Sequence, residues 1–327
     1  MGFFDHISDG DMATLERIRQ RAEQFDGYGG ETTEAAEKLA LEVRCRWFES
    51  GFQGWGPDDL RAALFTEFRM LHMGGYPPTE RHYTYLLALD AASNGNDGVF
   101  SPWTGLTKID GKWFIPEDLP HIEAFNAAER EKKHPNEKVM IDLTLVPEPY
   151  AGRLDAPIVL LSLNPGAAAD DPEWHGKSSL QELVLANLRQ EPSEWPLHYL
   201  HPDLKDSPGG RWYRKLLKPL IAAAGGGETG TQLVSQRVLN VEFHGYHSIS
   251  YLPLPVTLPT QRWMFSRLLY HLDERAVVIG LRGKVSWVTA LPELARVAKW
   301  AHSAQTSLVS PNNVGEKTFA DAIAALR

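Results

Sequence analysis

The strand predicted at residues 237–243 is mostly hydrophobic and ends in a dense group of polar side chains. Its members are hydrogen-bond donors and acceptors of fixed geometry: Asn240, Glu242, His244, Tyr246, His247 and Ser248. Because a strand projects alternate residues to the same side, we expect Asn240, Glu242 and His244 to line one face. Such a face suits recognition of a planar polar ligand, for example the edge of a nucleobase. Two other uses stay open: metal ligation by Glu and His, and burial of the histidines against backbone carbonyls.

A second polar group follows the aliphatic run 158–163. Asn164-Pro165-Gly166 ends this run, and the carboxylates of Asp170 and Asp171 follow after small residues. A run this apolar is typical of a strand buried on both faces, and open parallel sheets carry their ligands at the carboxyl ends of strands. We therefore interpret Asn164 as a candidate site residue, although Asn-Pro-Gly is also an ordinary turn sequence. The two carboxylates are explained equally well as residues that stabilise a helix N-terminus.

Two further connections between strands and helices carry polar residues. Arg282 and Lys284 follow residues 276–281 beside an expected helix N-terminus, where anions bind well. Residues 304–309 are followed by small polar residues, which include Ser310, Asn312 and Asn313. Four polar connections at the carboxyl ends of strands predict one crevice along one edge of a sheet.

Charge is divided unevenly along the chain. Residues 1–150 hold 15 Lys and Arg against 26 Asp and Glu, a net charge of −11, whereas residues 151–327 hold 18 against 16, a net charge of +2. The second part also has basic residues between Arg211 and Lys218. An anionic partner is therefore permitted there, although the whole chain carries −9 and a charge run is more often a solvated helix face.

Common cofactor motifs are missing from the sequence. The glycine-rich residues 222–230 show neither a P-loop nor a G-x-G-x-x-G pattern, and we interpret them as a loop. Neither H-E-x-x-H nor G-x-S-x-G occurs. Cys45 is the only cysteine, which excludes an intrachain disulfide and a metal site built from several thiolates. We expect no cofactor and no metal.

The elements that must position these residues alternate between strand and helix. Strands are predicted at residues 157–163, 237–243, 276–281 and 304–309, and helices near 178–190, 211–224, 260–272, 284–290 and 315–326. This alternation predicts an α/β domain over residues 141–327, with a mostly parallel central sheet flanked by helices. Residues 1–140 are predicted to form a mostly helical acidic module, with helices near 12–25, 34–48, 57–72, 80–92 and 120–133 and a hairpin on the Asp110-Gly111 turn.

No segment suited to a membrane is found in the sequence. No apolar run approaches the roughly 20 residues that a membrane span needs. The first residues show neither the basic region nor the apolar region of a signal peptide. We expect a cytoplasmic protein with no membrane partner.

The order of these features resembles the uracil-DNA glycosylase superfamily over about residues 145–327. Leu163-Asn164-Pro165-Gly166 resembles the first motif of the branch that uses Asn-Pro-Gly. Val238-Leu239-Asn240 resembles the strand whose Asn reads the base edge, and Ser310-Pro311-Asn312-Asn313 resembles the loop that enters DNA. The segment Pro147-Glu148-Pro149-Tyr150 resembles a signature of some bacterial members. The order of the motifs is more specific than any one of them.

This resemblance implies a monofunctional DNA glycosylase. Such an enzyme flips a base out of the stack, hydrolyses its N-glycosidic bond and leaves an abasic site. Asn164 would orient the water, Asp170 or Asp171 would assist as a base or stabilise the sugar cation, and Tyr150 would stack on the base. The base would also be contacted by Pro165, Gly166, Asn240, Glu242 and Tyr246. DNA would be contacted by Arg211, Arg282, Lys284, Ser310, Asn312 and Asn313.

The sequence departs from the family pattern at two places. The histidine of the second motif is missing, since Ser310 or Leu308 stands in its position, and the first motif carries Asn164 rather than Asp. His244 or His247 would then supply the missing electrophilic assistance. The polar group after Asn240 is richer than a reader of uracil needs, which favours an uncommon base. Glucosylated hydroxymethylcytosine in phage DNA is one such base, and antiphage defence or DNA repair is the corresponding role.

Three alternatives stay open. The first is a DNA-binding module on the same fold that has lost catalysis, in line with the missing histidine. The second is a hydrolase of free nucleosides or nucleotides, which the net negative charge favours. In the third, the acidic module of residues 1–140 is the functional part and docks to a protein partner or mimics the charge of DNA.

Overall fold

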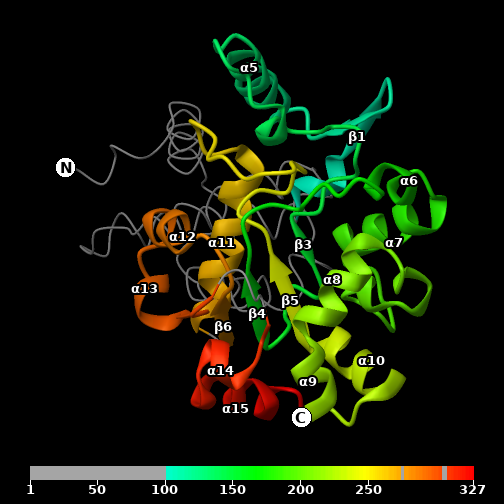
Figure 1. Ribbon diagram of the computed structural model, residues 1–327, viewed down its shortest axis with the longest axis vertical. Coiled ribbons are helices and arrows are strands. Elements are labelled where there is room, and N and C mark those ends of the chain that lie inside the picture. The colour runs from blue at the N-terminus through cyan, green and yellow to red at the C-terminus, as the bar shows by residue number, and fades with distance from the viewer. Residues whose placement is uncertain (1–100, 274–275, 304–307) are drawn as a thin grey trace, which may run out of the picture. The chain divides into compact units, whose positions relative to one another are not determined.

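The computed structural model describes residues 101–273, 276–303 and 308–327 (Figure 1). The chain divides into two compact units, Met1–Thr104 and Gly105–Arg327, and the second contains the α/β fold. The helices predicted near residues 12–25, 34–48, 57–72 and 80–92 lie outside the described residues, as do residues 304–307 of the last predicted strand.

A five-stranded mixed sheet forms the centre of the second unit. Its order is β3 (Tyr150–Ala151), β5 (Val238–Val241), β4 (Ile158–Leu161), β6 (Val277–Gly280) and β7 (Lys299–Trp300). Strand β3 is antiparallel to β5, and every other pairing is parallel. All residues of β4 and β5 are buried, as expected for strands covered on both faces. The α/β class and the mostly parallel sheet are therefore confirmed.

Helices flank this sheet. Between β4 and β5 the chain forms α6 (Asp171–His175), α7 (Ser178–Leu188), α8 (Pro208–Leu216), α9 (Lys218–Ala223) and α10 (Gly227–Arg237). After β5 it forms α11 (Pro259–Asp273), α12 (Lys284–Ala290), α13 (Leu294–Val297), α14 (Pro311–Val314) and α15 (Glu316–Ala325). Figure 1 shows α7, α8 and α10 to one side of the strands and α11, α12 and α13 to the other.

The chain order of the strands reverses direction at β4. From β4 the chain runs first to β5 on one side and then to β6 on the other. In open α/β sheets the connections that follow the strands at such a reversal separate and leave room for a ligand outside the carboxyl ends. We call the ends of β4, β5 and β6 the carboxyl edge of the sheet.

One predicted loop is a helix. Residues 222–230 were expected to be a loop, but α10 begins at Gly227, and Gly225, Gly226 and Gly227 have positive φ angles of 99°, 69° and 60°. These glycines form the turn between α9 and α10. Within α10, a Cβ at Gly230 would lie 2.8 Å from the carbonyl oxygen of Ile221, so glycine allows the two helices to approach closely. The prediction was wrong because this glycine serves helix packing and not only a turn.

The predicted hairpin is confirmed. Strands β1 (Thr107–Ile109) and β2 (Lys112–Phe114) are joined by Asp110 and Gly111, both with positive φ angles. The hairpin and α5 (Leu119–Arg130) pack within the second unit. Asn126 exchanges two hydrogen bonds with the backbone of Ile141, and residues 105–140 are thereby attached to the chain that enters the sheet.

Membrane-spanning helices were searched for in the described residues. None of the helices there is both long enough and apolar enough to cross a bilayer.

Candidate functional site

Polar residues that follow β4 and β5 lie side by side. The register pairs Leu161 with Val241, and backbone hydrogen bonds continue past the strands, from Ser162 N–H to Val241 O at 2.8 Å and from His244 N–H to Leu163 O at 3.1 Å. The Asn-Pro-Gly turn and the polar group after Asn240 therefore meet at the carboxyl edge, as the sequence predicted.

Asn164 presents a side-chain carbonyl whose orientation is fixed. Its Nδ2 donates to Pro165 O at 3.0 Å, to Ser248 O at 3.0 Å and to Ser248 Oγ at 2.9 Å. Backbone carbonyls only accept hydrogen bonds, so the amide nitrogen must point toward them. Among the described residues no donor reaches Asn164 Oδ1. Asn164 is half-buried, and this oxygen is able to accept a hydrogen bond from a water molecule.

A buried line of hydrogen bonds crosses from β4 to β5. Ser162 Oγ donates to Asn240 Oδ1 at 2.9 Å, and Asn240 Nδ2 donates to Glu242 Oε1 at 2.7 Å. Both ends of the Asn240 amide are thus engaged inside the protein, and its side chain is 1% exposed. In this structure Asn240 orients Glu242.

Glu242 has a buried carboxyl group, and only one of its two oxygens is hydrogen-bonded within the described residues. Its Oε2 has no hydrogen-bond partner in the described part of the chain. Burial, with a smaller contribution from the charge of Glu148, raises the pKa of Glu242 to about 8 against the lowering effect of the Asn240 hydrogen bond. The carboxyl group is therefore mostly protonated at neutral pH, and its O–H is a donor.

His244 lies beside this carboxyl group on the same segment and is buried. Its ring stacks on Tyr251, with 5.7 Å between ring centroids and 22° between ring planes. Its Nδ1 has no partner among the residues described. Burial and the neighbouring His247 lower the pKa of His244 to about 4, so the imidazole is neutral at physiological pH.

His247 and Ser248 contact the backbone carbonyls of the Asn-Pro-Gly turn from the protein interior. His247 Nδ1 lies 2.6 Å from Gly166 O, and its Nε2 lies 2.9 Å from Val146 O. Both contacts are hydrogen bonds at the same time only when the ring carries two protons, because carbonyl oxygens cannot donate. Ser248 N–H donates to Pro165 O at 3.3 Å. His247 therefore positions the turn.

Glu148 is the residue that sequence reasoning missed. Its Oε1 accepts from the hydroxyl of Tyr199 at 2.7 Å and lies 3.6 Å from His198 Nε2, while its Oε2 lies 3.9 Å from His247 Nε2. Burial would raise its pKa, but the neighbouring His198, His247 and His175 lower it to about 2. Glu148 is therefore a buried carboxylate that faces His198 and His247. The sequence feature that could have indicated Glu148 is its position between two prolines, directly before β3.

Three donor groups meet closely enough to consider a metal. One donor atom from each of Glu148, His175 and His247 lies within 4.8 Å of the others. Two imidazoles and a carboxylate suit a divalent transition metal. However, both nitrogens of His247 face carbonyl oxygens, and a protonated nitrogen has no lone pair for a metal. The contacts of His247 therefore fit hydrogen bonds to the backbone better than a metal centre.

The two carboxylates after the turn have structural partners. Asp170 Oδ2 lies 3.0 Å from Arg211 Nη2, and both side chains are exposed at this ion pair. Asp171 is buried and accepts from the backbone N–H of Ala168, which closes the turn that begins α6. Burial raises the pKa of Asp171. These contacts account for both residues and for Arg211 without a ligand.

The two predicted base-contacting tyrosines lie in the core. The hydroxyl of Tyr150 donates to Leu188 O at 2.8 Å. The hydroxyl of Tyr246 donates to Asp118 Oδ2 at 2.9 Å and accepts from Ile115 N–H at 3.1 Å. Each tyrosine is 1% exposed. The chain bends after Val241, so strand alternation no longer applies at residue 246, and both hydroxyls serve packing.

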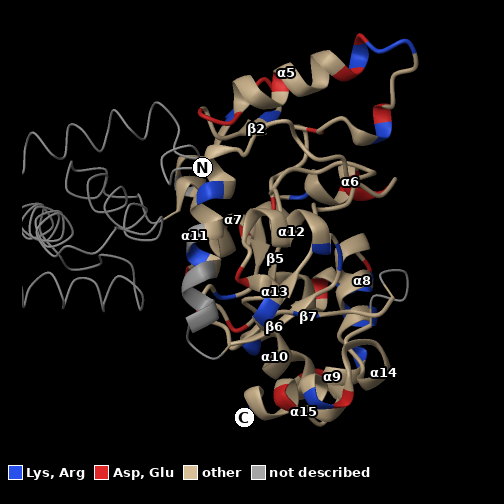
Figure 2. Cartoon of the chain, turned by 90° about the vertical axis from the view of Figure 1, so that its left-hand side faces the viewer, with Lys and Arg blue, Asp and Glu red and all other residues tan. Residues whose placement is uncertain are grey.

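Arg282 and Lys284 are exposed at the carboxyl edge. Leu281 N–H donates to Leu161 O at 2.9 Å, which places these residues beside the end of β4. Gly283 between them has a φ of 71°, and a Cβ there would clash with Leu163, the neighbour of Asn164. Figure 2 shows acidic and basic segments interspersed over the unit.

The loop that was predicted to contact DNA is partly engaged in internal hydrogen bonds. Ser310 precedes α14, and Asn312 is exposed. Asn313 is buried, accepts from Ser303 N–H at 2.8 Å and donates to Leu308 O at 3.0 Å. Only Asn312 of the two asparagines faces solvent.

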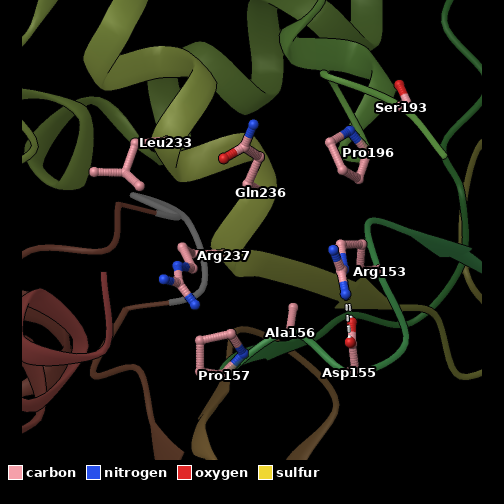
Figure 3. Close-up of a pocket in the computed structure, with 9 residues that line it drawn as sticks. All are labelled: Arg153, Asp155, Ala156, Pro157, Ser193, Pro196, Leu233, Gln236 and Arg237. Carbon is pink, nitrogen blue, oxygen red and sulfur yellow. Dashed lines mark hydrogen bonds and ion pairs between the residues drawn. The ribbon is translucent and has the colours of Figure 1, made fainter. Parts of the chain in front are cut away.

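A cavity of about 400 Å³ lies at the opposite edge of the sheet (Figure 3). Its lining includes Ala156 and Pro157, which precede β4, and Arg237, which precedes β5. Arg153 in its wall is paired with Asp155. This cavity is separate from the Asn164 turn, because the strands run from one to the other.

Comparison of the chain with protein-family models, with curated proteins and with solved structures found no match.

Proposed function

We propose that the chain is a monofunctional DNA glycosylase with a uracil-DNA glycosylase-like fold, which hydrolyses the N-glycosidic bond of a flipped, modified base. The observation that carries the proposal is the Asn164 side chain. Its nitrogen is fixed by three acceptors, and its oxygen is left to bind water at the carboxyl edge of the sheet. The resemblance of its Asn-Pro-Gly turn to the family's first motif assigns this position the same task.

The chemistry needs a water, a stabilised sugar cation and a stabilised leaving base. Breaking the glycosidic bond leaves positive charge on the sugar, which the dipole of the Asn164 carbonyl stabilises while it orients the attacking water. The base must be held by groups that favour its developing negative charge. Glu242 Oε2 and His244 Nδ1 are buried polar atoms without partners in the described residues, and they lie beside this turn in the β4–β5 register.

His244 is the better candidate for the missing family histidine. Its ring is neutral and has a nitrogen that makes no internal hydrogen bond. His247, the other candidate, has both nitrogens engaged with backbone carbonyls behind the turn. A neutral imidazole that donates to the departing base would supply the electrophilic assistance that the second motif lacks.

DNA would reach the site across exposed polar residues. Arg282, Lys284 and Asn312 are solvent-exposed, and the first two lie beside the end of β4. Phosphate contacts by such residues give DNA binding that weakens as salt is raised. A modified cytosine of phage DNA, with a role in antiphage defence, is the target that we propose within this class.

The test is incubation of the full-length protein with uracil-containing, unmodified, hydroxymethylcytosine-containing and glucosylated phage DNA, followed by hot alkali to cut abasic sites. Wild type should break strands in one of these DNAs. Asn164→Ala should lose at least about 100-fold in rate, the lower end of what a positioned catalytic group contributes. Gln236→Ala removes an exposed amide at the opposite edge and is the matched control.

Other results would favour the alternatives. Intact strands throughout, with binding that weakens in salt, would replace catalysis by a DNA-binding module. Release of bases from free nucleosides, without DNA cleavage, would identify a nucleoside hydrolase.

A further inference from the structure

Glu242 combines three features that a purely structural carboxyl group does not need. It is 7% exposed, its Oε1 is fixed by Asn240, and its Oε2 has no partner among the residues that the structure describes. A buried polar atom without a partner destabilises the fold and so calls for an explanation, and use by a ligand is one. The second oxygen is therefore the functional end of this side chain.

The surroundings keep a proton on that oxygen. Glu148 approaches from the segment before β3, Tyr213 from α8 and Arg282 from the end of β6, while Asn240 lies on its own strand. Burial and the Glu148 charge outweigh the Asn240 hydrogen bond and the Arg282 charge, so the neutral acid persists to about pH 8. Asn240, which is itself held by Ser162, fixes the carboxyl group, so its orientation does not depend on the substrate.

We propose that Glu242 is the general acid that protonates the departing base, and that the substrates are consequently bases that leave poorly as anions, amino-pyrimidines of the cytosine type rather than uracil. This inference rests on the proposed glycosylase function. Uracil leaves as a comparatively stable anion, so hydrogen bonds suffice for it. A cytosine-type base leaves readily only when a proton reaches it.

The atoms of this step balance. The bond between C1′ of the sugar and the base nitrogen breaks, and its electron pair stays with the base. The Oε2 proton of Glu242 passes to the base. Water held by Asn164 adds its oxygen to C1′ and releases a proton to solvent, from which Glu242 is protonated again. The net reaction is hydrolysis, with hydrogen on the base and hydroxyl on the sugar.

Leaving-group dependence tests the assignment. Single-turnover rates are measured for one DNA sequence that carries 5-fluorouracil, uracil, hydroxymethylcytosine or glucosylated hydroxymethylcytosine at one position. The variant Glu242→Gln keeps an oxygen for Asn240 and a donor in place of Oε2, but it cannot transfer a proton. Glu182→Gln replaces an exposed carboxylate on α7 and is the control.

We expect Glu242→Gln to lose about 100-fold or more on the cytosine-type bases and less than about tenfold on 5-fluorouracil, as for loss of a general acid. The wild-type rate on a cytosine-type base should fall as the pH rises through about 8, and this fall should be missing in the variant. Thermal unfolding of both variants shows whether they are folded.

Each other outcome decides against one of the two claims. Equal losses on all bases, or a wild-type enzyme that removes only uracil, would overturn the role of Glu242 and leave the glycosylase in place. No product from wild type on any DNA would overturn the glycosylase function and this assignment with it.

Discussion

Nδ1 of His247 lies 2.6 Å from the carbonyl oxygen of Gly166, so a buried imidazole contacts the turn that contains Asn164. The same ring contacts Val146 O at 2.9 Å and faces the Glu148 carboxylate. The carboxyl edge is thus supported from the interior by contacts between distant parts of the chain, since Val146 and His247 are separated by 101 positions. Support of this kind keeps the Asn164 carbonyl in one orientation.

Ser248→Ala removes one of the three acceptors of the Asn164 amide and leaves the Ser248 backbone carbonyl in place. We expect kcat for base release to fall about five- to tenfold, a loss of about 1 kcal/mol, because the amide is less strictly oriented. DNA affinity should not change. Ser250→Ala is the control, since only the backbone oxygen of Ser250 bonds to Ser248. An unchanged kcat for Ser248→Ala would contradict the role given to Asn164.

Glu148→Gln removes the buried carboxylate that faces His198 and His247. We expect the free energy of unfolding near neutral pH to fall by about 3–5 kcal/mol, as for a broken buried ion pair. Urea unfolding followed by tryptophan fluorescence measures this loss, with Glu182→Gln as the control.

The same pair predicts how stability depends on acid. The pKa of Glu148 is lowered in the fold from its ordinary value of 4.5 to about 2. Below 4.5 the unfolded chain binds a proton that the folded chain does not, so the stabilisation by Glu148 is complete above that pH and is lost as the pH falls toward 2. The difference between wild type and Glu148→Gln should therefore shrink in acid. A difference that stays constant with pH would show that the ion pair is not the cause.

Tyr246→Phe tests whether the Tyr246 hydroxyl stabilises the core or contacts the base. The hydroxyl bonds to Asp118 and to the backbone of Ile115, so its loss should lower stability by about 1–3 kcal/mol. Base release by the folded fraction should be unchanged. A raised KM with unchanged stability would instead place this tyrosine against the flipped base.

Metal ions should have no effect on the folded protein. Binding at Glu148, His175 and His247 would require His247 to give up hydrogen bonds to two carbonyl oxygens. We expect one equivalent of Zn²⁺ to leave the unfolding temperature unchanged and a chelator to leave activity unchanged. Stoichiometric binding near neutral pH, lost in His175→Ala, would identify a metal centre.

Strands β4, β5 and β6 could be predicted from the sequence because they are largely buried and mostly apolar. The two-residue strands β3 and β7 at the sheet edges were not predicted. The polar ends of β4, β5 and β6 could be predicted as well, since parallel strands bring their carboxyl ends to one edge. The positions of Asn164 and Glu242 at this edge were predicted in this way.

The supporting network could not be predicted. Glu148, His175, His198 and His247 come from four separate segments, and no spacing in the sequence indicates that they meet. Tyr246 was expected to contact the base, but the chain bends after Val241 and this tyrosine lies in the core. Asn240 was expected to read the base, but the tertiary partners Ser162 and Glu242 engage both ends of its amide.

The hydrogen bonds of the Asp118 carboxylate determine the shortest fragment of this protein that we expect to fold. It accepts hydrogen bonds from the Tyr246 hydroxyl after β5 and from Thr260 at the start of α11, and it is fully buried at the beginning of α5. A fragment that begins at residue 141 would leave both hydroxyls buried without an acceptor, whereas one that begins at Gly105 keeps them satisfied. The hairpin and α5 are therefore structural parts of the second unit, and we expect their removal to destabilise the sheet.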